Sequence, residues 1–157
     1  MKKAISLIMI VLTMALPLVW SGCNTQTANA NVITEDSEIT SLKKGDEVTF
    51  IIALEGAPTT QTFGLKPLFD EEYFTMIGTP ELLIECEGFS NYSNNMFVVV
   101  FDEETNLNGN FMKFTLKAIK ETSETTVNCE ISLKNIKNNT VNTRVTPWSG
   151  SIEVPEI

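Results

Sequence analysis

The sequence contains no histidine among its 157 residues. Histidine-based zinc sites, Ser-His-Asp triads and Cys-His nucleophile pairs are therefore excluded as the chemistry of this chain. Basic residues are also scarce, because 11 Lys and Arg face 20 Asp and Glu and give a formal net charge of −9. A surface of that sign repels nucleic acid and anionic lipid headgroups. The acidic residues are dispersed, which is typical of a soluble surface; an acidic docking face is the alternative.

Cysteine is equally rare. The chain has only Cys23, Cys86 and Cys129, whose spacing fits no metal site. Cys86 and Cys129 each stand in a stretch of alternating apolar residues. They are compatible with one disulfide in an oxidising compartment or with two buried free thiols. The sequence predicts no cofactor.

Long hydrophobic runs are absent except at the N-terminus. Lys2 and Lys3 precede residues 4–20, a stretch without a charged residue. This stretch is shorter than the about 20 apolar residues of a spanning helix, and Pro17 interrupts it. A basic start, an apolar run and small residues after it predict a signal peptide over residues 1–22 and export of the remainder.

Two cleavage sites are open after this segment. Trp20-Ser21-Gly22-Cys23 resembles the lipobox of bacterial lipoproteins, in which the cysteine receives a diacylglycerol and becomes the new N-terminus. Ala28-Asn29-Ala30 is the alternative, an A-x-A site for ordinary cleavage and secretion. The first is favoured because the apolar run stops directly before it. It predicts lipidation of Cys23, a flexible tether over residues 23–31, and attachment to the outer face of the cytoplasmic membrane or to the cell surface.

Helix signals are nearly absent, whereas strand signals recur along residues 32–157, a length that suits one domain. The candidate strands are short, rich in alternating or β-branched apolar residues, and separated by clusters of Gly, Asn and Pro; they cover 47–55, 60–69, 82–86, 96–101, 111–119, 127–135 and 151–154. The one helix candidate is 70–77, where a loop fits equally well. This pattern predicts an all-β fold, an antiparallel β-sandwich.

The order of these features resembles a cohesin domain. The resemblance covers about 90 residues, from Lys44 to Asn135, and rests on four stretches: K-G-D-E-V at 44–48, T-F-G-L-K-P-L-F-D at 62–70, F-V-V-V-F-D at 97–102 and L-N-G-N-F-M-K-F-T-L-K-A at 107–118. They match a strand opening, a strand running into an aromatic-Asp turn, an apolar strand with an acidic loop, and a strand of alternating apolar residues.

The resemblance implies a fold and a function. Cohesins are nine-stranded jelly-roll sandwiches, related to some carbohydrate-binding modules, and they bind calcium-loaded dockerin modules to assemble polysaccharide-degrading enzymes on the cell surface. A lipid-anchored cohesin-like domain would therefore be a cell-surface, non-catalytic receptor for a dockerin-bearing or other extracellular protein. No short motif transfers dockerin contacts, so the resemblance assigns no binding residues.

Binding of carbohydrate by a module of similar fold is the first alternative, and a structural or adhesion role is the second. Stacking on sugar needs exposed aromatic rings. The best candidates are Trp148, in the turn-like segment Pro147 to Gly150, and Tyr92, in a segment rich in Asn and Ser. For Trp148, packing in the core or in a turn is the favoured interpretation.

Two groups of oxygen-bearing side chains are candidates, one for a calcium site and one for a catalytic site. Carbonyl and carboxylate side chains recur at every second position before Gly109, at Asp102, Glu104, Asn106 and Asn108. No register fits an EF-hand, so a solvated hairpin loop is favoured over a structural calcium site. The acidic run at Asp70, Glu71 and Glu72 could serve glycoside hydrolysis only with further groups converging on it, so the chain is expected not to be an enzyme.

Overall fold

The computed structural model describes residues 27–36, 38–135 and 137–157; the predicted signal peptide and Cys23 lie outside the described residues. The described chain forms eleven strands and no helix, which confirms the all-β class. It includes no helix long and apolar enough to cross a membrane. The strands are β1 (Thr27–Thr34), β2 (Ser41–Lys43), β3 (Glu47–Glu55), β4 (Thr60–Phe69), β5 (Phe74–Leu82), β6 (Gly88–Ser93), β7 (Met96–Thr105), β8 (Gly109–Ala118), β9 (Thr122–Lys134), β10 (Thr140–Thr146) and β11 (Trp148–Glu153).

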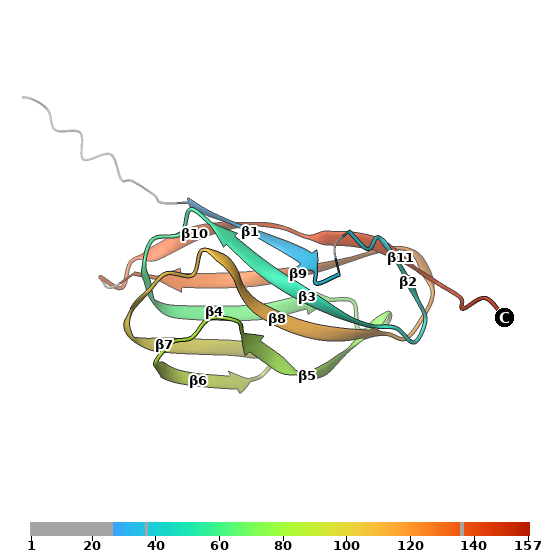
Figure 1. Cartoon of the computed structure of the whole chain (residues 1–157), viewed down its shortest axis with the longest axis horizontal. Helices are drawn as coiled ribbons and strands as arrows, with labels where there is room; N and C mark the ends of the chain where they lie inside the picture. Colours follow the sequence, from blue (N-terminus) through green and yellow to red (C-terminus); the bar gives the residue numbers. More distant parts are fainter. Residues whose placement is uncertain (1–26, 37, 136) are drawn as a thin grey trace, which may run out of the picture.

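The strands pack as a two-layer sandwich and run along its long axis (Figure 1). Hydrogen bonds link β5, β8, β3, β1 and β10 in one layer, and β6, β7, β4 and β9 in the other. β10 belongs to both layers, because it pairs in parallel with β1 and antiparallel with β9. Nine strands thus form one continuous path, and β11, paired in parallel with β2, extends the second layer beside β9. The predicted jelly-roll sandwich is confirmed, with two parallel pairs among its antiparallel ones.

The strands with the strongest apolar signals were predicted well. Residues 47–55 and 60–69 coincide with β3 and β4. Four further predictions overlap strands whose bounds differ by a few residues, namely β7, β8, β9 and β11. The prediction for 82–86 is wrong beyond Leu82, where the chain leaves β5. The segment 70–77 is neither helix nor loop throughout, because a turn at 70–73 leads into β5.

The prediction of a flexible tether over residues 23–31 is wrong for residues 27–31, and residues 23–26 lie outside the described residues. Residues 27–31 belong to β1, so the described domain begins by Thr27 and not at Val32. Alternate residues of β1 point into the sandwich, and Ala28 and Ala30 are buried there. The small and polar residues of this stretch had suggested a linker, but small side chains can also fill one face of a strand.

Aromatic side chains join the layers at the core. Phe50 of β3 stacks on Phe114 of β8 with ring centroids 5.7 Å apart, within one layer. Phe63 of β4 meets Phe111 of β8 edge to face at 5.0 Å, across the two layers. Edge-to-face and offset pairs are the favoured aromatic geometries, and each adds about 1 kcal/mol beyond its buried area. Most of the phenylalanines therefore belong to the core.

Candidate functional site

The sandwich has two outward faces, and the charged side chains of the first are paired with one another. We call the outward surface of β5, β8, β3 and β1 the β3–β8 face. Its charged side chains pair across neighbouring strands: Lys117 lies 3.8 Å from Glu47, and Lys113 lies 3.6 Å from Glu81. Two facing threonine hydroxyls of β3 and β8 are 3.0 Å apart. Cross-strand pairs of this kind satisfy a solvated sheet surface without a partner.

The second outward face has an apolar centre. We call the outward surface of β6, β7, β4 and β9 the β4–β7 face. Phe89 is 70% exposed and lies opposite Val100, which is 43% exposed. Met96, which is 39% exposed, and half-buried Val98 point the same way on β7, because they alternate with inward residues. Gly64 lies opposite Val98 and leaves the middle of the face flat.

Polar side chains continue this face on β4 and β9. In register, Val100 is followed by Thr62 and then Lys134, and Gly64 is followed by Ser132. Lys66 and Glu130 lie opposite each other further along. The β4–β7 face therefore combines an apolar half with a polar half, an arrangement typical of protein interfaces.

Two local features of the sequence fix the apolar half. A Cβ on Gly88 would lie 2.3 Å from the carbonyl oxygen of Val100, so β6 can approach β7 this closely only with glycine there. Asn94 and Asn95 have φ of 53° and 63°, as both central residues of a type I′ hairpin turn do. This turn sets the register of β6 on β7 and so places Phe89 beside Val100. Neither Gly88 nor the pair Asn94-Asn95 was predicted from the sequence to fix this hairpin.

Comparison with known proteins gives a fold and no sequence relative. No family model and no curated protein matches the chain. A cohesin module from a family 33 glycoside hydrolase of Clostridium perfringens superposes with a TM-score of 0.67 and 11% identity, covering 83% of this chain and 100% of that one. The chain has the cohesin fold.

Other cohesin structures also superpose on this chain. In a type I cohesin–dockerin complex from Clostridium thermocellum, the matching chain gives a TM-score of 0.59 with 17% identity, over 82% of this chain and 95% of that one. A non-cellulosomal cohesin from the archaeon Archaeoglobus fulgidus gives 0.56 with 11% identity, over 82% and 92%. At such identities the likeness concerns the fold alone. The described chain has eleven strands, two more than the nine that the cohesin resemblance implied, because β2 and β11 lie off the main path.

Trp148 lies in the core of this cohesin fold. Its ring is 7% exposed, and its Nε1 donates a hydrogen bond of 2.7 Å to the carbonyl oxygen of Ile39. It meets Phe50 edge to face at 5.3 Å and Phe74 at 6.5 Å. This burial agrees with the favoured interpretation of Trp148, packing in the core, and leaves little of the ring exposed for a sugar.

Tyr92 is also directed inward, from the edge strand β6. It packs against the core opposite Phe97, and its hydroxyl donates to Asn95 Oδ1 at 2.8 Å with Met76 Sδ 3.3 Å away. Partial burial raises the pKa of this hydroxyl. Tyr92 thus supports the β6–β7 hairpin, whereas the neighbouring Phe89 is the exposed ring.

Cys86 and Cys129 are free thiols in this structure. Cys129 is buried on the inner side of β9, and desolvation raises its pKa to about 12. Cys86 is half-buried in the segment between β5 and β6, and desolvation raises its pKa as well. Of the two predicted states, one disulfide or two free thiols, this structure contains the free thiols.

The oxygen-rich segment before Gly109 is tied up in hydrogen bonds. Asn108 accepts from the Ala57 amide and donates to the Ala57 carbonyl, both at 2.9 Å, and also donates to Asn106 Oδ1. Glu104 accepts from the Thr59 hydroxyl at 2.6 Å. These contacts fasten the β7–β8 turn to the β3–β4 turn. In the part of the chain that the structure describes, no three His, Cys, Asp or Glu side chains are grouped to hold a metal.

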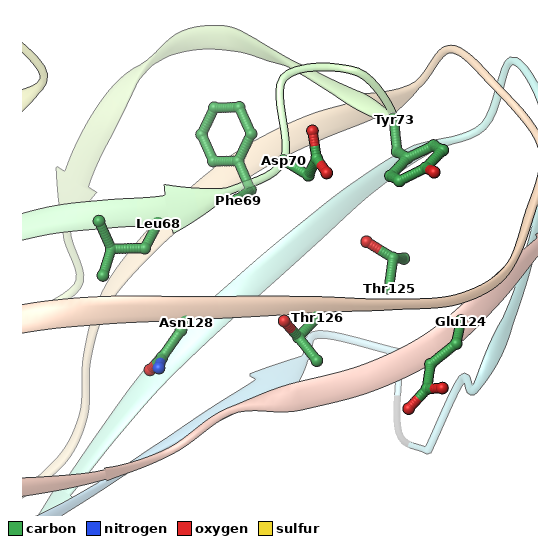
Figure 2. A pocket seen from close by; sticks show the side chains of 8 residues that line it. All are labelled: Leu68, Phe69, Asp70, Tyr73, Glu124, Thr125, Thr126 and Asn128. Atoms are coloured by element: carbon green, nitrogen blue, oxygen red, sulfur yellow. The ribbon is translucent and has the colours of Figure 1, made fainter.

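The acidic run at 70–72 lies beside a shallow pocket at one end of the sandwich. The pocket is about 540 Å³ and is formed by the end of β4, the following turn and the start of β9 (Figure 2); its lining residues are Leu68, Phe69, Asp70, Tyr73, Glu124, Thr125, Thr126 and Asn128.

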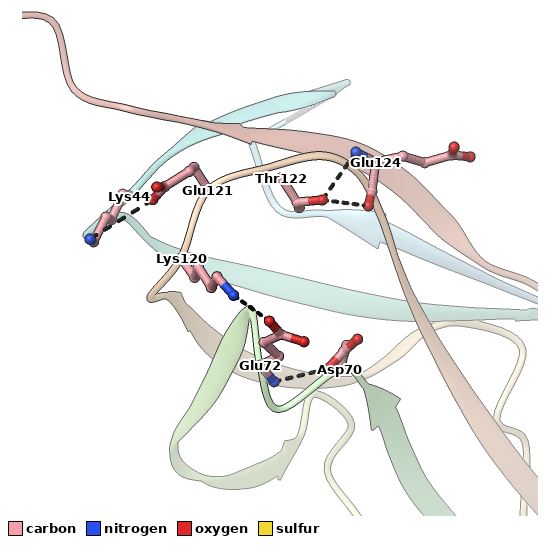
Figure 3. A network of polar contacts seen from close by, with 7 residues as sticks. All are labelled: Lys44, Asp70, Glu72, Lys120, Glu121, Thr122 and Glu124. Carbon is pink, nitrogen blue, oxygen red and sulfur yellow. Dashed lines mark hydrogen bonds and ion pairs between the residues drawn. The ribbon is translucent and has the colours of Figure 1, made fainter.

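Asp70 accepts a hydrogen bond from the Glu72 amide, and Glu72 pairs with Lys120 (Figure 3). The hydrogen bond to Glu72 raises the pKa of the Lys120 ammonium, which also lies 5.8 Å from the centroid of the Tyr73 ring.

Proposed function

We propose that this protein is a non-catalytic binding module that docks a partner protein on its β4–β7 face. The observation that carries the proposal is the contrast between the two faces. On the β3–β8 face the lysines pair with glutamates, and the exposed Ile33 and Ile77 are separated by two strands, whereas the β4–β7 face exposes Phe89, Met96 and Val100 together on adjacent strands. Contiguous exposed apolar side chains beside polar ones are typical of an interaction site.

The partner that the proposal favours is a dockerin module or a similar extracellular protein module. The support is the cohesin fold, together with the solved cohesin–dockerin complex among its structural neighbours. Calcium in such a complex belongs to the dockerin, so this chain needs no metal of its own. The proposed setting is the outer face of the membrane or the cell surface, with a role in recruiting proteins of polysaccharide breakdown.

A capture experiment tests the partner. A fragment of residues 24–157 keeps every described strand. Immobilised, it is exposed to the dockerin-bearing proteins of the same organism in calcium and, separately, in chelator. We expect retention in calcium and release in chelator, because the dockerin loses its calcium. Retention of no dockerin, together with binding to insoluble polysaccharide, would replace the proposal with the carbohydrate-binding alternative.

The pocket at Tyr73 is where that alternative would be located. Phe69 and Tyr73 line it with Asp70 and Asn128, a combination of rings and polar groups that suits a sugar. The Lys120 ammonium already lies over the Tyr73 ring, however, so the pocket offers no row of free ring faces. For this reason the protein-binding function is preferred.

A further inference from the structure

A second groove lies at the end of β1, in the layer opposite the β4–β7 face. Its volume is about 790 Å³, within the range of about 300–1,000 Å³ that is usual for ligand sites. The segments that follow β1 and β10 form its walls, and its apolar lining comes from Val32, Ile33, Ile39, Ile51, Pro147 and Trp148. We call it the β1 groove.

The β1 groove borders a strand edge that loses its neighbour. β1 pairs with β10 only as far as Asn31, whereas its pairing with β3 continues to Thr34. β10 ends at Thr146, and β11 then pairs with β9 and β2 in the other layer. In the part of the chain that the structure describes, residues 32–34 of β1 therefore have a paired strand on one side only.

The backbone of this edge is directed toward the open side. The Glu35 amide donates to the Thr49 carbonyl oxygen of β3 at 2.9 Å. Backbone groups alternate in direction along a strand, so Val32 and Thr34 direct their amide and carbonyl groups away from β3. Such an edge is a template for a further strand, which an extended peptide can supply through its own amides and carbonyls.

The walls and floor of the groove are held in place before any ligand binds. Trp148 Nε1 donates to the Ile39 carbonyl oxygen at 2.7 Å, which joins the two walls. On the floor, Ile33 is 42% exposed and lies opposite Ile51, which is 9% exposed. An apolar side chain of the peptide would cover Ile33, and the fixed walls reduce the entropy lost on binding.

The charge of the groove selects the peptide further. Glu35 and Glu38 line it and are exposed, and no lysine or arginine is among its described lining residues. Neither carboxylate takes part in an ion pair within the described chain, whereas other glutamates of this layer pair with Lys113 and Lys117. A cationic side chain on the ligand would complement these two charges.

We propose that the β1 groove binds an extended peptide segment of a partner protein. The segment adds a strand beside residues 32–34, places an apolar residue over Ile33 and directs lysine or arginine toward Glu35 and Glu38. This site is independent of the docking proposed above, because the β4–β7 face belongs to the other layer.

A peptide titration tests the proposal. Residues 24–157 contain Trp148 as the single tryptophan, and it lines the groove. The probe is the end-blocked peptide Lys-Thr-Ile-Thr-Lys, whose isoleucine and lysines share one face when it is extended. We expect a saturable change in Trp148 fluorescence. N-methylation of the three central amides, which removes backbone donors and keeps the side chains, should weaken binding about 10-fold or more.

Matched variants locate the peptide on the protein. Ile33→Ser should weaken binding about 10-fold. The control Ile77→Ser, on the edge strand β5, has a similarly exposed side chain and should bind like the wild type. Glu35→Gln combined with Glu38→Gln should weaken binding about 5-fold at low salt.

Several results would overturn the proposal. Absence of any fluorescence change at saturating peptide would refute binding, and undiminished affinity of the N-methylated peptide would refute strand addition. Equal affinities of Ile33→Ser and Ile77→Ser would place the peptide outside the groove. A dimer in sedimentation that Ile33→Ser abolishes would assign the groove to a second copy of the chain instead.

Discussion

At the scale of single residues, Gly150 shows how closely β11 is packed. A Cβ there would lie 2.4 Å from Trp148 Cζ2 and 2.5 Å from the Thr40 carbonyl oxygen. We expect Gly150→Ala to lower the free energy of unfolding by about 1–3 kcal/mol, because neither neighbour can withdraw without disturbing the core. Gly64→Ala is the matched control, since its Cβ would meet Ser132 Cβ at an ordinary 3.6 Å. Urea denaturation of both variants is the measurement; equal midpoints would refute the packing argument.

The two thiols give a second prediction at this scale. With a pKa of about 12, the Cys129 thiol is ionised to about one part in 10,000 at pH 8, and it is also buried. A thiol reagent at pH 8 should therefore modify Cys86 first and Cys129 only on unfolding. If the folded and the unfolded protein both fail to react with the reagent, and two thiols become reactive only after reduction, Cys86 and Cys129 form a disulfide instead.

The same burial makes stability depend on pH. The Cys129 thiol has a pKa of 9.0 when unperturbed and about 12 in the fold. Its contribution is fully present below pH 9 and is lost as pH rises toward 12, because the unfolded chain then gives up the proton more readily. Urea midpoints should accordingly fall more steeply in the wild type than in Cys129→Ala between pH 8 and 10.

At the scale of elements, the edge strand β6 carries the test of the docking face. Phe89→Ser should leave stability nearly unchanged, because the ring is 70% exposed, and should weaken partner binding about 30-fold, the effect of losing about 2 kcal/mol at an interface hot spot. Ile77→Ser, on the edge strand β5 of the opposite layer, is the matched control and should bind normally. Titration calorimetry with a calcium-loaded dockerin measures both; equal affinities would remove Phe89 from the interface.

Strands differed in how far the sequence predicted them, for physical reasons. β3 is apolar, rich in β-branched residues and bounded by glycine turns, so its bounds could be predicted. β5 contains Gly78 and Pro80, which lie at an irregularity in its pairing with β8 and resemble a loop. β1 and β6 are rich in small and polar residues, and only their pairing partners along the chain make them strands.

The candidate site was predicted less well than the fold. Trp148 was the best candidate for an exposed ring because its neighbours are turn formers, although core packing was favoured; its partner Ile39 lies 109 positions away in the chain and could not be predicted. Phe89 was not among the predicted ligand contacts, although its ring is 70% exposed. Which face of an edge strand a ring occupies depends on register, and register in β6 is set by the Asn94-Asn95 turn and the close approach at Gly88.

At the scale of the whole molecule, the two outward faces of the sandwich differ in the side chains that they present. The β3–β8 face pairs its lysines with glutamates, and the β4–β7 face exposes Phe89, Met96 and Val100 on adjacent strands. Because the two faces lie on opposite layers, a partner docked on the proposed β4–β7 face would leave the β3–β8 face free.

Methyl NMR on residues 24–157 tests whether a partner docks on the β4–β7 face, since both outward faces of the sandwich carry methyl groups that point outward. Val98, Val100 and Met96 report on the β4–β7 face, and Ile33 and Ile77 report on the β3–β8 face. On addition of a calcium-loaded dockerin module from the same organism, we expect the methyl signals of Val98, Val100 and Met96 alone to shift. Chelator should reverse these shifts. Shifts confined to Ile33 and Ile77, or no shift at saturating dockerin, would contradict docking on the β4–β7 face.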